Sequence, residues 1–234
     1  MNIIEEIFKV LFDKYGPQYW WPGDSPFEII IGAILTQSTN WNNVERAIKN
    51  LKENNLLDPI KIFNLSIKDL EELIKPCGFY RVKAKRIMNF LNFLFDNYNG
   101  DLKTMNNEPT GILRRKLLNI SGLGNETVDS ILLYSFQRPV FVIDKYTKII
   151  GSCLKIGEYS LTYFEWQKIF QDSLFPIYQI FNEYHALLVT HGKKYCRKCK
   201  GSCFLRELFY LKKPQFSHLE YPQLKDMSSY QLST

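Results

Sequence analysis

The spacing of apolar residues is the feature that most constrains the fold of this chain. Apolar side chains recur three and four positions apart through most of the sequence, as in IEEIFKVLFDKY (residues 4–15) and RVKAKRIMNFLNFLF (residues 81–95). Alternating strand patterns joined by two-residue turns are absent from the sequence. The pattern therefore predicts an all-α fold.

Glycine-bearing turns divide this helical pattern into segments. They fall at Gly78, at Asn99-Gly100 and at Gly122–Gly124. The stretch FEIIIGAIL (27–35) is nearly continuous and predicts a buried helix, although its short length leaves a strand open. Further helices are predicted near residues 144–154, 162–174 and 179–190.

Length and composition narrow the class of protein. The 234 residues suffice for one large or two small domains. No stretch reaches the roughly 20 apolar residues that a membrane span needs, and MNIIEEIFKV is acidic where a signal peptide is basic. We therefore expect an intracellular protein of the cytoplasm or nucleoid, a monomer, with no membrane partner. The net charge of +6 is compatible with a polyanionic partner but does not require one.

Residues 120–126, ISGLGNE, predict a hairpin between two short helices. Glycine lets the backbone approach a ligand closely, and the exposed amides of a helix N-terminus favour an anion such as phosphate. A tight helix–helix turn would account for the same residues. Twenty residues later Asp144 ends an apolar run and begins the next helix, where Asp is a common N-cap, with Thr147 following.

These motifs together resemble one known family. LLNISGLGNETVDSILLYSF and VIDKYTKII look like the helix-hairpin-helix and downstream Asp of the endonuclease III-like (HhH-GPD) superfamily of DNA glycosylases. FEIIIGAILTQST, GFYRVKAKRI and YHALLVTHGKKYC continue the resemblance in family order, over roughly residues 5–205. YWWP, TQSTNW and VIDKY are most similar to the 3-methyladenine DNA glycosylases of endonuclease-III-like type.

The resemblance implies a two-domain helical fold. We expect a helical barrel domain over residues 26–136, with the helix-hairpin-helix at about 112–136. Residues 1–25 and 137–213 would form a second helical domain with a cysteine-bearing loop. From Pro214 the chain is polar and irregular, which predicts a loose tail over 214–234.

The resemblance also assigns residues to the handling of DNA and of the damaged base. Gln37 would fill the hole left by a flipped base and Phe79 would wedge the stack, since a base inside the duplex is unreachable. The remaining DNA contacts would come from Gly122, Gly124, Lys83, Lys85, Arg86 and Lys193. The base pocket would consist of Trp20, Trp21, Pro22, Trp41 and Glu126. An electron-rich aromatic pocket favours a cationic alkylated purine over undamaged adenine.

Asp144 would be the catalytic carboxylate, which stabilises positive charge on the sugar and positions or deprotonates water. Bifunctional members of the superfamily carry a lysine where this chain has Glu126, and a carboxylate cannot form their Schiff base. The resemblance thus implies a monofunctional enzyme that leaves an intact abasic site. Lys145, beside Asp144, is a weaker candidate for a substitute nucleophile.

Three closely spaced cysteines near the end of the chain suggest a metal site. Many relatives hold a [4Fe–4S] cluster on four cysteines, but this chain has only Cys196, Cys199 and Cys203, with Phe209 at the position expected for the fourth. We therefore expect a degenerate site without a complete cluster and no cofactor for the chemistry. A tetrahedral zinc would need one more ligand, for which His191 is the nearest candidate.

The sequence thus predicts a DNA glycosylase that binds damaged duplex DNA and hydrolyses the N-glycosidic bond of alkylated purines. Two alternatives remain. One is an endonuclease III-type enzyme with lyase activity on oxidised pyrimidines, against which Glu126 and the tryptophans speak. The other is a DNA-binding module that has kept the hairpin and lost the chemistry. A mismatch adenine glycosylase is disfavoured because the chain has no room for the extra recognition domain of that family.

Overall fold

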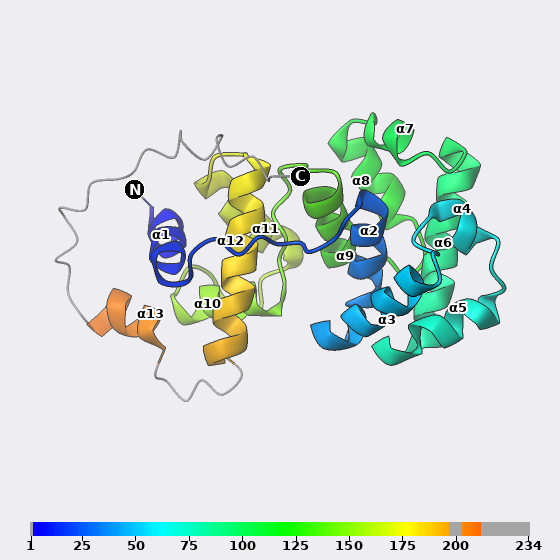
Figure 1. Ribbon diagram of the computed structural model, residues 1–234. Helices are drawn as coiled ribbons and strands as arrows, with labels where there is room; N and C mark the ends of the chain where they lie inside the picture. The colour runs from blue at the N-terminus through cyan, green and yellow to red at the C-terminus, as the bar shows by residue number, and fades with distance from the viewer. Residues whose placement is uncertain (1, 197–202, 212–234) are drawn as a thin grey trace. The chain divides into compact units, whose positions relative to one another are not determined.

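A computed structural model describes residues 2–196 and 203–211, and these are entirely helical apart from turns and loops, with no strand among them (Figure 1). The predicted all-α fold is confirmed. The chain forms two compact units, one containing Tyr19–Val142 and the other combining the segment up to Gln18 with the segment from Ile143 onward. The expected domain boundaries at 25/26 and 136/137 differ from these divisions by seven and six residues. No helix in the described part of the chain is long and apolar enough to cross a membrane.

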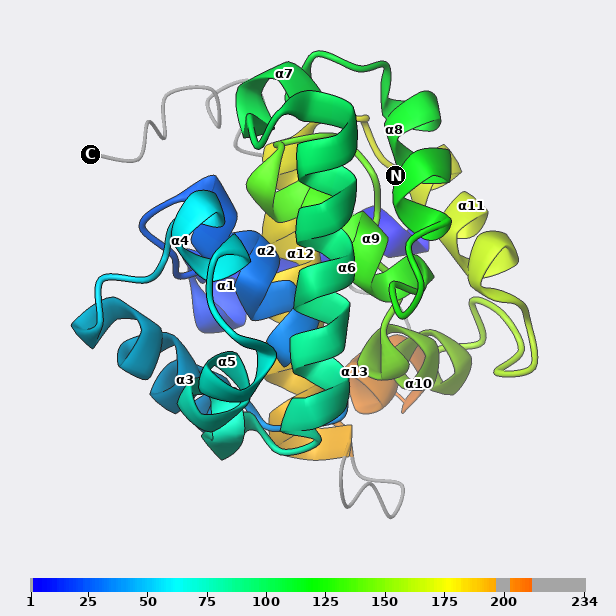
Figure 2. The same ribbon diagram turned by 90° about the vertical axis from the view of Figure 1, so that its right-hand side faces the viewer.

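The unit Tyr19–Val142 consists of eight α-helices and two shorter helical turns. They are α2 (Pro26–Leu35), α3 (Trp41–Glu53), α4 (Pro59–Phe63), α5 (Ile67–Ile74), η1 (Lys75–Cys77), α6 (Tyr80–Tyr98), α7 (Leu102–Asn106), α8 (Thr110–Leu118), α9 (Asn125–Ser130) and η2 (Ile131–Ser135). Figure 2 shows the long helix α6 with α4 and α5 on one side and α8 and α9 on the other. Helices α2, α4 and α5 pack directly against α6.

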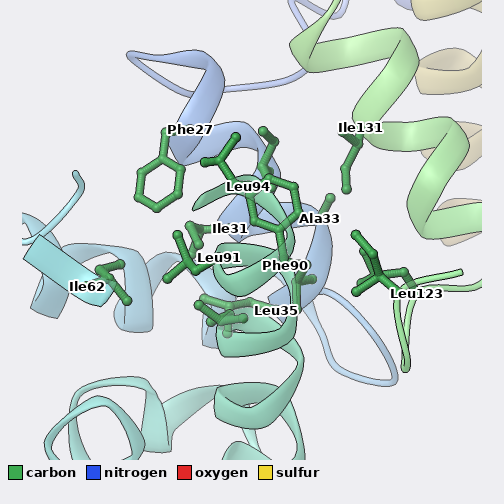
Figure 3. Close-up of a cluster of buried hydrophobic side chains, with 14 of the residues drawn as sticks. Phe27, Ile31, Ala33, Leu35, Ile62, Phe90, Leu91, Leu94, Leu123 and Ile131 are labelled. Atoms are coloured by element: carbon green, nitrogen blue, oxygen red, sulfur yellow. The ribbon is translucent and has the colours of Figure 1, made fainter. Parts of the chain in front are cut away.

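Helix α2 forms the centre of this unit. Ser25 caps its first turn by accepting a hydrogen bond from the Glu28 amide at 3.2 Å, and Pro26 occupies the first helical position, where a missing N–H costs nothing. Side chains of α2 meet those of α4, α6 and η2 in one apolar core (Figure 3). Burying each isoleucine here contributes about 2 kcal/mol. Burial on all sides explains why 27–35 reads as a continuous apolar run without helical amphipathicity.

The second unit consists of α1 (Ile3–Tyr15), α10 (Lys145–Cys153), α11 (Tyr163–Ser173), α12 (Tyr178–His191), η3 (Gly192–Cys196), α13 (Phe204–Arg206) and η4 (Glu207–Leu211). Helix α12 is its centre and packs against α1 and α10, and Figure 1 shows α1 beside it. The Tyr184 hydroxyl on α12 donates to the backbone oxygen of Ile4 at 2.8 Å, which fixes α1 to this helix. The helices expected near 144–154, 162–174 and 179–190 correspond to α10, α11 and α12.

A buried ion pair joins the two helices of the hairpin. Arg114 on α8 donates from Nε to Oδ1 of Asp129 at 2.6 Å and from Nη2 to Oδ2 at 2.9 Å. Asp129 is fully buried, and the Arg114 side chain is 17% exposed. The paired geometry satisfies both charges in a place where either alone would be costly.

Removing Asp129 should therefore destabilise this unit strongly. We expect Asp129→Ala to lower the free energy of unfolding by about 3 kcal/mol or more, because it removes the buried carboxylate that pairs with the part-buried Arg114 guanidinium. Urea unfolding followed by circular dichroism measures the loss. Asp172→Ala, which breaks the exposed pair with Lys168, is the matched control and should cost several times less. Equal losses in the two variants would contradict this account.

A part-buried carboxyl group on α12 makes the stability of the second unit dependent on pH. Glu183 accepts a hydrogen bond from the Gln18 amide at 2.7 Å, and burial raises the pKa of Glu183 to about 7. The folded state therefore holds this proton over a range in which the unfolded chain has lost it. Its stabilising effect is complete below pH 4.5 and is lost as the pH rises through 7.

Glu183→Gln keeps an acceptor for the Gln18 amide and removes the titration. We expect the variant and the wild type to be equally stable near pH 4.5, and the variant to be more stable by about 2 kcal/mol at pH 8, after allowance for solvent screening. Unfolding curves recorded across this range test the claim. A difference independent of pH would refute it.

Candidate active site

The hairpin between α8 and α9 is held in a defined shape by three neighbouring side chains. Asn89 of α6 donates to the backbone oxygen of Ser121 at 3.0 Å, and the Gln37 amide after α2 donates to the backbone oxygen of Gly122 at 3.2 Å. Gly122 has φ of +97°, and a Cβ atom there would lie 2.5 Å from Cγ of Arg86. Only glycine fits this position, for both backbone and packing reasons.

Gly124 differs from Gly122 although both belong to the same motif. It is exposed, begins α9 with an extended backbone (φ −90°), and a Cβ atom there would meet nothing within 4 Å. The protein itself therefore does not require glycine at this position. The space beside the start of α9 is therefore open.

Gln37 is more firmly held than a residue at a helix end needs to be. Its amide nitrogen also donates to Oγ1 of Thr127 at 2.8 Å, and its side-chain oxygen accepts from Arg86. The side chain thus connects the end of α2 to the hairpin and to α6. Its expected role as a void filler would require release of some of these bonds.

Phe79 is placed in solvent by its backbone. Its side chain is 71% exposed, and its φ of +47° follows a φ of +66° at Gly78, immediately before α6. A left-handed conformation is uncommon for an aromatic residue and turns the ring out of the helix path. Exposure of a large apolar ring at this point is what a stack-wedging residue needs.

The basic residues of α6 do not all face solvent. Lys85 is exposed and Arg86 is part-exposed, but Lys83 is 1% exposed and its Nζ donates to the backbone oxygen of Cys77 at 2.8 Å. Burial lowers the pKa of Lys83. The expectation that Lys83 contacts DNA is therefore wrong, because its ammonium group satisfies the C-terminal end of η1 inside the unit.

Three tryptophans form one aromatic cluster in this unit. The ring centroids of Trp20 and Trp41 lie 6.1 Å apart, those of Trp21 and Trp41 5.3 Å apart, and those of Trp20 and Trp21 5.9 Å apart. Tyr134 of η2 completes the cluster at 5.2 Å from Trp21. All three indoles are partly exposed, and Pro22 beside them is exposed. Four of the five residues predicted for the base pocket, Trp20, Trp21, Pro22 and Trp41, therefore lie close together.

Two further residues shape this cluster. Gly32 allows the Trp21 indole to pack on α2, since a Cβ atom there would lie 3.1 Å from Nε1. Glu45 accepts a hydrogen bond from Nε1 of Trp41 at 2.7 Å, one turn along α3. Glu45 was not among the predicted pocket residues, although its four-residue spacing from Trp41 signals such a contact. Tyr134 was not predicted either, because only the tertiary fold brings it to Trp21.

Glu126 lies in the first turn of α9 and is exposed. A carboxylate is favoured there by the helix dipole. Ser130, one turn later, donates to the backbone oxygen of Glu126 at 2.7 Å. The Glu126 side chain is exposed to solvent beside the hairpin. Residue 126 therefore presents a carboxylate and not an amine.

Asp144 belongs to the other unit, where it is the N-cap of α10. Its Oδ1 accepts from the Thr147 amide at 2.7 Å and from Oγ1 of Thr147 at 2.8 Å. The carboxylate side chain is 13% exposed. The predicted N-cap is confirmed, and the segment before it, Phe141–Ile143, is buried as the apolar run implied.

A histidine lies behind this carboxylate. Nε2 of His185 on α12 is 4.0 Å from Oδ1 of Asp144. Burial lowers the pKa of His185, Lys193 adds to this effect, and Asp144 opposes it. The imidazole is therefore neutral near pH 7 and leaves the charge of Asp144 uncancelled. Lys193 itself is exposed, as a phosphate contact would require.

The described part of the cysteine-bearing loop brings one histidine and one cysteine together. Nε2 of His191 lies 3.1 Å from Sγ of buried Cys203, and Nδ1 lies 3.0 Å from the Tyr15 hydroxyl. Cys196 is part-exposed, and Cys199 lies outside the described residues. No three ligand side chains converge within the described ranges. A cubane cluster takes four thiolates, and the three cysteines of this loop alone do not complete that ligand set.

Comparison with known proteins agrees with this arrangement. Residues 31–158 match the family model described as HhH-GPD superfamily base excision DNA repair protein. A Methanocaldococcus jannaschii protein named “Putative DNA repair glycosylase MJ1434” is 48% identical over 86% of this chain and 92% of its own length. Endonuclease III of Thermotoga maritima is 28% identical over 65% of this chain and 66% of its own length.

Solved structures show the same fold. The 3-methyladenine DNA glycosylase MagIII of H. pylori, bound to 1,N6-ethenoadenine, superimposes with a TM-score of 0.72 and 27% identity, over 82% of this chain and 97% of that one. An endonuclease III–DNA complex gives 0.71 at 20% identity, over 85% and 90% of the two chains. This chain belongs to the HhH-GPD superfamily of base excision repair DNA glycosylases.

Proposed function

We propose that this protein removes alkylated purines of the 3-methyladenine type from duplex DNA by hydrolysis, without cutting the strand. The observation that carries the proposal is the cluster of Trp20, Trp21 and Trp41, which presents partly exposed indole rings. An indole face attracts a cationic ring by about 1–2 kcal/mol when water is excluded. N-alkylated purines carry that positive charge, and undamaged adenine does not.

A carboxylate next to one of these rings supports the same preference. Glu45 is anchored to Trp41 through the indole N–H, so it fixes the ring and adds negative potential beside it. Glu126 is a second exposed carboxylate, on α9. The similarity to MagIII, which binds a modified adenine in its solved complex, supports a purine substrate.

The reaction follows from the chemistry of Asp144. Departure of the base develops positive charge on the sugar, and the fixed carboxylate stabilises that charge. Water then adds to the anomeric carbon, and its proton passes to the carboxylate or to solvent. An alkylated base leaves with the bonding electron pair as a neutral purine, so no strong general acid is needed. Glu126 provides no amine for a Schiff base, which supports an intact abasic product.

The proposal is tested by incubating the protein with methylated duplex DNA and measuring freed bases and strand breaks in the same sample. We expect 3-methyladenine release without breaks. Asp144→Asn should lower the single-turnover rate by at least about 100-fold while DNA affinity stays within about threefold. Strand breaks formed without alkali, or a borohydride-trapped adduct, would favour the endonuclease III-type alternative. DNA binding without release of any base would favour a non-catalytic module.

The two glycines of the hairpin should respond oppositely to substitution. Gly124→Ser places a side chain in the open space at α9 and supplies an N-cap, so we expect unchanged or increased stability and about 10-fold weaker DNA binding. In Gly122→Ala the new Cβ atom would clash with Arg86, and alanine would have to adopt a positive φ, so this substitution should lower stability. Thermal unfolding and fluorescence anisotropy with labelled duplex measure the two effects. Tight DNA binding by Gly124→Ser would show that the amides of α9 do not contact phosphate.

Phe79 provides a test of base flipping that leaves the chemistry intact. We expect Phe79→Ala to slow release from duplex DNA by about 10-fold and to have little effect on a damaged base placed opposite a gap, where less unstacking is needed. Phe175→Ala, which removes a ring of similar exposure (69%), is the control. Equal slowing on both substrates would assign Phe79 to folding rather than to flipping.

A further inference from the structure

The carboxylate of Asp144 is bound more firmly than an N-cap requires. A helix N-cap needs one acceptor bond from a backbone amide, which the Thr147 amide supplies at 2.7 Å. The Thr147 hydroxyl adds a second donor to the same oxygen, Oδ1, at 2.8 Å. Every hydrogen bond that the described residues make to this carboxylate therefore falls on one of its two oxygens.

The hydroxyl of Thr147 is also buried, which costs free energy because a polar group is removed from water. Its side chain is fully buried at the third position of α10, where valine would fill the same volume without a polar group. A buried hydroxyl is tolerated when it is hydrogen-bonded, and its partner here is Asp144. The hydroxyl is therefore accounted for by what it does to the carboxylate rather than by packing.

Two donors on one oxygen fix the rotation of a carboxylate. The terminal torsion of an aspartate is broad and roughly two-fold, so a single amide bond leaves the plane free to tilt and the two oxygens free to exchange. The amide and the hydroxyl come from the same residue at fixed angles, and together they select one orientation. His185 limits the space on the Oδ1 side, with its Nε2 at 4.0 Å. Oδ2 is the oxygen left to face a reacting group.

We propose that Thr147 is a positioning residue that holds Oδ1 of Asp144 and thereby presents Oδ2 as the reactive oxygen. The inference rests on the proposed glycosylase chemistry of Asp144. A carboxylate already oriented before the sugar becomes cationic needs no reorganisation during the reaction. The hydroxyl of Thr147 then affects the chemical step and not DNA affinity.

Thr147→Val and Thr147→Ser separate this role from a structural one. The valine variant keeps the amide cap and the volume, so we expect its single-turnover rate of 3-methyladenine release to fall by about 10- to 100-fold with DNA affinity within twofold. The serine variant restores the hydroxyl and should return the rate to within about threefold of wild type. Thr162→Val is the matched control, because Thr162 caps α11 through its own hydroxyl and the substitution should lower the melting temperature without slowing release.

Crystal structures of the wild type and Thr147→Val provide a readout independent of activity. We expect the Asp144 carboxylate in a single orientation in the wild type, and rotated or in two conformers in the variant. A wild-type rate in Thr147→Val, a loss that serine does not restore, or an unchanged carboxylate would each overturn the inference. If the wild type releases no base from any alkylated DNA, the proposed function fails, and the carboxylate orientations still decide whether Thr147 positions Asp144.

Discussion

The arrangement of this protein depends on polar groups that are buried with their partners. The Arg114–Asp129 pair is the clearest case, since it joins the two helices of the hairpin through two hydrogen bonds to a fully buried carboxylate. Apolar contacts are non-directional and would allow the short helices α8 and α9 to slide against each other. A two-point ion pair fixes their register. The hairpin with Gly122 and Gly124 connects these two helices.

The same principle applies at the carboxylate of the second unit. Asp144 owes its place to the N-cap geometry of α10 and to the buried run that precedes it. His185 lies behind it, and its lowered pKa leaves the imidazole neutral near pH 7. A carboxylate that is both fixed and charged is the arrangement that a developing sugar cation requires. The tryptophan cluster is preorganised in a similar way, because Gly32 and Glu45 each fix one of its indoles.

The sequence predicts much of this structure because helical periodicity and cap residues act locally. Three local predictions are confirmed: the N-cap at Asp144, the turn at Asn99-Gly100 and the buried helix at 27–35. Each depends mainly on residues that are neighbours in the sequence. Lys83 shows where such reasoning fails. A lysine on a basic helix face suggests a solvent contact, but its burial under η1 depends on how separate elements pack. Tyr134 joined the aromatic cluster for the same tertiary reason. The middle cysteine of the terminal loop, Cys199, lies outside the described residues, so its expected role stays a prediction.

The central claim concerns which damaged base this site accepts. Its most direct test is a competition in one reaction between two differently labelled duplexes, one carrying 3-methyladenine and the other carrying thymine glycol, with the ratio of kcat/KM measured from both. The aromatic cluster and Glu126 predict that the alkylated purine is released and that the duplex with the oxidised pyrimidine stays intact. Preferential loss of thymine glycol, accompanied by strand cleavage, would contradict the account.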